Sequence, residues 1–149
     1  MVATSSTQTS PSPNAPLTRH NGLCAAAPRA HMAGWNTYLA RVDDMNRDFF
    51  VYVPPSYEGD DGWPVVFAAP GSGMAPLTFA NIANMTRVAE ERRWILAVLH
   101  GINDELNVDV DCTATPFPDD VGYVARALDM LEESLCVDVR QVHAFGFSR

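Results

Sequence analysis

The sequence predicts an α/β fold with a mainly parallel sheet. Three observations indicate it: an aromatic hairpin pattern near the start, three short apolar runs after it, and two segments of helical spacing between those runs. Strands that alternate with helices of this length form parallel strands connected by crossover helices. The expected order is hairpin, strand, helix, strand, helix, strand.

The hairpin is predicted from two runs rich in aromatic and β-branched residues. "WNTYLARV" (Trp35 to Val42) and "RDFFVYVP" (Arg47 to Pro54) are joined by the polar "DDMN". Residues of this kind favour strands, and a short polar connection favours an antiparallel pair. The double proline at 54–55 ends the second strand, because proline cannot donate to a strand ladder.

The next three strands are predicted at "VVFAA" (65–69), an uninterrupted apolar run, and at "WILAVLH" (94–100) and "RQVHAFG" (140–146), which are read as strands of the same buried type. Continuous hydrophobicity, rather than alternation, is typical of a strand that is covered on both faces. We therefore expect His143, inside the last of these runs, to be a core residue.

Two segments have helical spacing. The first, "LTFANIANMTRVAEERR" (77–93), is read as one helix, and the second is "PDDVGYVARALDMLEESL" (118–135). Asp119 or Asp120 can cap the second helix. Its expected buried stripe consists of Val121, Val124, Leu128, Leu131 and Leu135.

Residues 1–18 are rich in serine, threonine and proline, which predicts a disordered linker followed by one domain over residues 19–149. The last predicted strand has no helix after it to cover it, so we expect the domain to be partial. No basic-then-apolar signal peptide is visible at the N-terminus.

Composition narrows the classes of partner. The net charge is −8 and no run of basic residues occurs, which argues against nucleic acid. No stretch approaches the roughly 20 apolar residues of a membrane span. The cysteines and histidines lack metal-ligand spacing, so neither a metal nor another cofactor is expected. An acidic surface suits a neutral substrate such as a polysaccharide or an ester.

The chain ends in "GFSR", which matches a nucleophile elbow, G-x-S-x-G, up to its second glycine. In an elbow the serine stands on a tight turn between a strand and a helix, and its hydroxyl attacks a carbonyl. Ser148 directly follows a predicted strand, as this reading requires. The alternative is an ordinary turn.

A glycine-rich loop, "APGSG" (69–73), follows the first buried strand. The backbone amides of Gly71 and Ser72, with that of Arg149 after the serine, are candidate donors to an oxyanion. A P-loop would need a lysine and a dinucleotide loop a third glycine; both are missing. A plain strand-to-helix turn remains open.

Together these segments resemble a family of secreted esterases. "RDFFVYVPPSY", "WPVVFAAPGSG" and "DDVGYVARALDMLEESLCVDVRQVHAFGFSR" are similar to feruloyl esterases, acetylxylan esterases and polyhydroxybutyrate depolymerases. The resemblance implies the N-terminal part of an α/β-hydrolase three-layer sandwich that cleaves esters by a Ser-His-Asp mechanism. It implies Ser148 as nucleophile and a triad acid and histidine encoded after Arg149. The chain alone is then expected to be inactive.

The resemblance has one departure and one further implication. The family usually has His-Gly where this chain has Pro70-Gly71, which affects the oxyanion loop. Cys136 matches a family cysteine that bridges to one beyond the elbow, and Cys24 matches one near the mature N-terminus. Disulfides imply export, and Asn84-Met85-Thr86 is a glycosylation sequon.

Three alternatives stay open. The ester could be a polyester rather than a feruloylated or acetylated polysaccharide. The chain could be a non-catalytic binding relative that keeps the sheet. The G-x-S could also be a coincidence in another three-layer α/β domain.

Overall fold

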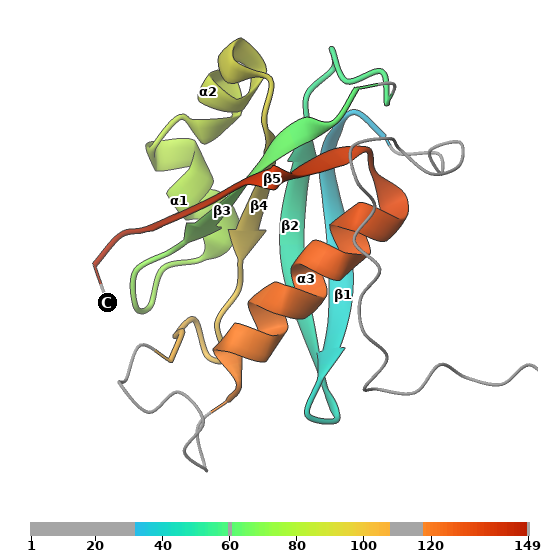
Figure 1. Cartoon of the computed structure of the whole chain (residues 1–149). Helices are drawn as coiled ribbons and strands as arrows, with labels where there is room; N and C mark the ends of the chain where they lie inside the picture. Colours follow the sequence, from blue (N-terminus) through green and yellow to red (C-terminus); the bar gives the residue numbers. More distant parts are fainter. Residues whose placement is uncertain (1–31, 60, 108–117, 149) are drawn as a thin grey trace, which may run out of the picture.

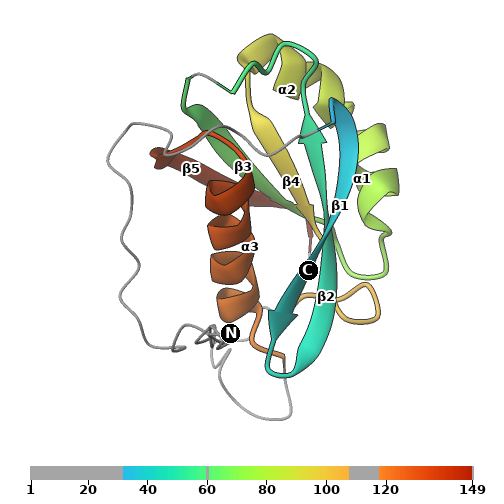
Figure 2. The same cartoon turned by 90° about the vertical axis from the view of Figure 1, so that its right-hand side faces the viewer.

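The computed structural model describes residues 32–59, 61–107 and 118–148, so the predicted linker lies outside them. They form a five-stranded mixed sheet of order β1-β2-β4-β3-β5, with α1 and α2 on one face and α3 on the other (Figures 1 and 2). Each face has its own buried apolar cluster. This three-layer arrangement confirms the predicted α/β class.

The hairpin consists of β1 (Gly34–Val42) and β2 (Met45–Val53) in antiparallel register. Its connection is the two-residue turn Asp43-Asp44, with φ of 49° and 60°. Two left-handed residues give the backbone twist that matches paired strands. The predicted "DDMN" loop was therefore too long, because its last two residues belong to β2.

The remaining strands are β3 (Trp63–Ala69), β4 (Ile95–Leu99) and β5 (Val137–Gly146). β3 runs parallel to both β4 and β5, while β2 joins the group antiparallel to β4. β3 and β4 are buried, as predicted. β5 is not, since it is an edge of the described sheet and pairs only with β3 there. The core prediction for His143 was wrong, because its side chain is exposed.

The first helical segment is two helices, α1 (Pro76–Ile82) and α2 (Met85–Arg92). The chain breaks at Asn84, whose φ of 50° lies in the left-handed region and ends the helical path. The break turns Ile82 outward, to 74% exposure, while Phe79 and Ala89 remain buried. The prediction of a single helix was wrong.

The second helix, α3 (Asp120–Ser134), forms as predicted. The Asp119 carboxylate accepts a hydrogen bond of 2.8 Å from the Gly122 amide, which is an N-cap. The expected stripe was correct at Leu131 and Leu135 and wrong at Val121, which is 62% exposed. The buried face consists of Asp120, Tyr123, Ala127 and Leu131.

A buried ionic network joins α3 to the sheet. Arg47 of β2 forms an ion pair with Asp120, and their side chains are 3% and 9% exposed. The Arg47 guanidinium carbon lies 3.8 Å from the centroid of the Tyr123 ring, and Nη2 donates to the His100 carbonyl at 3.3 Å. Asp120 therefore holds a charge inside the fold, while Asp119 is the cap.

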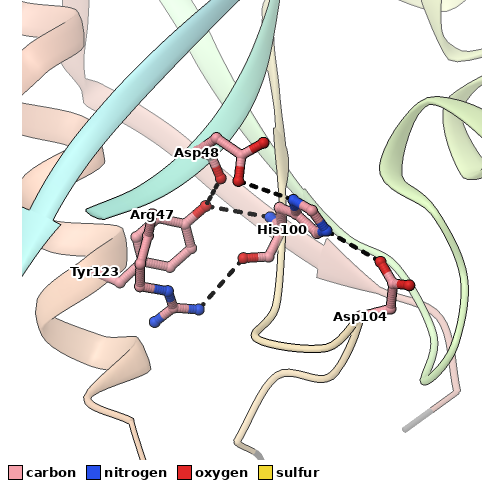
Figure 3. A network of polar contacts seen from close by, with 5 residues as sticks. All are labelled: Arg47, Asp48, His100, Asp104 and Tyr123. Carbon is pink, nitrogen blue, oxygen red and sulfur yellow. Dashed lines mark hydrogen bonds and ion pairs between the residues drawn. The ribbon is translucent and has the colours of Figure 1, made fainter. Parts of the chain in front are cut away.

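Tyr123 extends the network to Asp48, within β2, and to His100, which follows β4 (Figure 3). Its hydroxyl donates to the Asp48 carbonyl at 2.7 Å and accepts from the His100 amide at 3.2 Å. Burial raises the pKa of Tyr123 to about 12, so the phenol remains a donor at neutral pH.

Replacing Arg47 with alanine should lower the free energy of unfolding by about 3–5 kcal/mol, because Asp120 would be left as an unpaired buried charge. Urea denaturation measures it. Arg41→Ala is the control, since Arg41 is 71% exposed in its pair with Asp44 and should cost at most about 1 kcal/mol. Equal losses for the two variants would contradict the role given to Arg47.

Candidate active site

Ser148 lies just beyond the carboxyl end of β5 (Val137–Gly146), in an unusual backbone conformation. Its φ is 60°, in the left-handed region that serine rarely adopts. Such outliers cost energy and persist where the surrounding structure holds them, often at functional sites. The side chain is exposed. This is the local geometry expected of a nucleophile on a tight turn after a strand.

The glycine-rich loop lies directly against Ser148. Ala69 pairs with Gly146 at the ends of β3 and β5, and the Phe147 amide donates to the Ala69 carbonyl at 3.1 Å. A Cβ atom placed on Gly71 would be 2.9 Å from the Phe147 carbonyl oxygen and 3.2 Å from the Ser148 Cβ. Only glycine therefore fits at position 71 without a shift.

The amides of this loop divide into two groups. The Gly73 amide donates to the Asp104 carbonyl at 2.9 Å and that of Met74 to the Gly71 carbonyl at 3.0 Å. Among the described residues, the amides of Gly71 and Ser72 have no acceptor. Two unengaged amides beside a serine can stabilise an oxyanion. Arg149, the third expected donor, lies outside the described residues.

Three phenylalanine rings cluster near the carboxyl end of β5. The Phe79 ring of α1 lies 6.4 Å from that of Phe145 and 6.2 Å from that of Phe147, measured between centroids. Phe145 and Phe147 are 44% and 58% exposed. The residue that precedes Ser148 thus contributes to an apolar surface, which can contact an apolar part of a ligand.

The turn after β4, residues 101–105, also lies at the site, and it was not predicted from the sequence. The Ser72 hydroxyl donates to Glu105 Oε1 at 2.7 Å. Asn103 and Asp104 have φ of 56° and 60°, so the chain reverses sharply there. The signal in the sequence was "GINDE" directly after a buried strand, since Asn-Asp pairs tolerate left-handed conformations.

His100 is paired with two carboxylates, and one cysteine lies in the described part of the chain. His100 Nδ1 lies 2.9 Å from Asp48 Oδ1, and its Nε2 lies 3.0 Å from Asp104 Oδ1. Cys136 is 4% exposed, while Cys24 and Cys112 lie outside the described residues. In the described ranges there is no cluster of three or more metal-ligating side chains, and no helix is long and apolar enough to cross a membrane.

No protein-family model and no curated protein matches the chain in sequence. Similar solved structures exist, however. An S-formylglutathione hydrolase from Agrobacterium tumefaciens has a TM-score of 0.60 at 16% identity, over 82% of this chain and 52% of that protein. A ferulic acid esterase has a TM-score of 0.58 at 16% identity, over 75% and 47% of the two chains.

A carboxylesterase from Lactobacillus plantarum has a TM-score of 0.52 at 19% identity, over 76% of this chain and 42% of that protein. Likeness at such low identity shows the fold alone, which the chain shares with these three proteins. The chain spans about half the length of these structures.

Replacing Gly71 with alanine should lower the free energy of unfolding by about 1–3 kcal/mol, because the new methyl group would press on the Phe147 carbonyl. Chemical denaturation measures it. The matched control is Gly146→Ala, whose Cβ would meet the Ala69 Cβ at 3.5 Å, an ordinary contact. If the two variants were equally stable, the close approach of the loop to Ser148 would be wrong.

Proposed function

We propose that the chain is the first part of a serine carboxylesterase in which Ser148 is the nucleophile. The observation that carries the proposal is the contact between Gly71 and Ser148, with Ser148 in a left-handed conformation at the end of β5. A serine held on such a turn beside unengaged backbone amides is suited to acyl transfer. The fold shared with esterases supports the same class.

In this reaction Ser148 Oγ attacks the ester carbonyl carbon and gives its proton to a histidine. Amides near Gly71 and Ser72, with that of Arg149, stabilise the negative oxygen of the tetrahedral intermediate. The intermediate collapses to an acyl-enzyme and releases the alcohol, which takes the proton. Water, activated by the same histidine, then hydrolyses the acyl-enzyme.

The histidine and its acid are proposed to follow Ser148 in the chain, as in other α/β-hydrolases. Two histidines in the described part have other positions: His100 lies between two carboxylates, and His143 is exposed on β5. Neither is assigned to the triad. The chain alone should therefore bind Ser148-directed reagents poorly and turn over no ester.

For the substrate we propose an aromatic ester of a plant cell-wall polysaccharide, of the feruloyl type. The exposed rings of Phe145 and Phe147, which pack on buried Phe79, support it, because a phenyl acyl group can pack on such rings. One of the similar structures is a ferulic acid esterase. A polyester of short hydroxy acids is the second candidate, since the same apolar surface would accept its alkyl chain.

Ser148→Ala tests the nucleophile. A longer chain that adds the downstream acid and histidine should hydrolyse p-nitrophenyl and feruloyl esters, and the variant should lower kcat by about 10⁴–10⁶-fold. Ser56→Ala, at an exposed turn, is the control and should keep full activity. The 149-residue chain should show no turnover. Activity that survived in Ser148→Ala would contradict the assignment.

We also propose that the protein is exported, and that Cys136 is oxidised in it. The chain has three cysteines, and Asn84, the acceptor of the sequon, is exposed at the break between α1 and α2. Alkylation before and after reduction, read by mass spectrometry of protein secreted from its host, should find Cys136 in a disulfide. A fully reduced Cys136, or retention in the cytosol, would contradict export.

A further inference from the structure

We propose that the turn Gly101–Glu105, which follows β4, positions the oxyanion loop, defined as residues 71–73. Glu105 and His100 are then positioning residues for the reaction at Ser148. The inference rests on the proposed esterase function. It goes further by assigning a role to residues that are distant in sequence from the glycine-rich loop (69–73) and from the G-x-S motif (146–148).

Two consecutive residues of the loop are bonded to two consecutive residues of the turn. The Gly73 amide donates to the Asp104 carbonyl at 2.9 Å, and the Ser72 hydroxyl donates to Glu105 Oε1 at 2.7 Å. The second bond has a carboxylate acceptor, and hydrogen bonds to a charged acceptor are stronger than neutral ones. They engage one amide and one side chain, so the amides of Gly71 and Ser72 remain available to an oxyanion.

The turn itself has a fixed shape. Its amides at Asp104 and Glu105 donate to the Gly101 and Ile102 carbonyls at 3.2 Å and 3.1 Å. A Cβ atom on Gly101 would lie 2.2 Å from the Glu105 carbonyl carbon, so only glycine allows this closure. Because Asn103 and Asp104 hold left-handed conformations, the reversal is sharp.

His100 anchors the turn to the sheet (Figure 3). Its imidazole lies between Asp48 of β2 and Asp104 of the turn, at 2.9 Å and 3.0 Å from the two carboxylates. Its backbone is held as well, since its carbonyl accepts from Arg47 and its amide donates to Tyr123. A continuous set of contacts therefore runs from the buried ion pair to the oxyanion loop.

Support from this side is needed because position 70 is proline. Proline has neither an N–H nor a polar side chain, so it cannot donate a hydrogen bond to the loop or hold it through its side chain. Ser72 and Glu105 are both exposed, so water competes for their bond. The expected effect is therefore moderate, about one order of magnitude in rate.

A double-mutant cycle in the longer, active chain tests the inference. Glu105→Ala and Ser72→Ala should each lower kcat about tenfold with KM within about twofold, because a displaced donor weakens transition-state binding. The double variant should lose no more than either single one. Glu105→Gln, which keeps the acceptor oxygen, should restore most of the rate.

The matched control is Glu91→Ala, which removes an exposed carboxylate from a surface pair on α2. It should leave kcat unchanged. Independent, additive losses at positions 72 and 105, or a Glu105→Ala variant with the parental kcat, would overturn the inference while leaving the esterase proposal intact.

A second readout needs no activity. In the 149-residue chain, NMR hydrogen exchange at the Gly73 amide should be about tenfold faster in His100→Ala and Glu105→Ala than in the parent, and unchanged in Glu91→Ala. Unchanged exchange in the first two would overturn the positioning role. If the longer chain hydrolysed no ester, the esterase proposal would fail, and the exchange result would still decide whether the turn holds the loop.

Discussion

The arrangement of this part of the fold depends on one buried charge, the guanidinium of Arg47. A buried cation needs a paired anion and further hydrogen-bond acceptors, because desolvation without them costs several kcal/mol. Asp120 supplies the anion from α3, and the His100 carbonyl supplies an acceptor from the end of β4. The charge thus fixes the start of α3 against two strands of the sheet, and places His100 where its ring reaches the turn beside the oxyanion loop.

A second constraint is steric and acts where β3 pairs with β5, on the side of β3 away from β4. The pairing of Ala69 with Gly146 sets the ends of β3 and β5 side by side, and Gly71 then passes within contact distance of Phe147 and Ser148. A side chain at position 71 would separate the loop from the serine. The glycine is therefore explained by the site's geometry, whereas Gly73, with φ of 73° and open space around it, is explained by the backbone turn.

Much of the fold could be predicted because local patterns agree with tertiary burial. β3 and β4 are central strands, so their apolar runs are buried. The N-cap of α3 is formed by Asp119, directly before the helix, so it could be recognised locally. The errors occur where distant residues decide. The break at Asn84 and the exposure of His143 depend on what packs around them. The ion pair of Arg47 with Asp120 joins residues far apart in sequence, and no periodicity indicates it. Of the candidate site, the serine and the glycine loop could be found from motifs, but the Gly101–Glu105 turn could not.

The two constraints act together on the candidate site. The steric contact sets how near the loop comes to Ser148, but contact alone leaves the loop free to rotate its amides. The bonds from Asp104 and Glu105 remove that freedom on the other side, and they are anchored through His100 to the buried network. Catalysis by backbone amides requires donors that are oriented before charge develops. The hydrogen bonds to the loop come from residues that precede β5, so in the proposed site the orientation of the Gly71 and Ser72 amides does not depend on the groups proposed to move the proton.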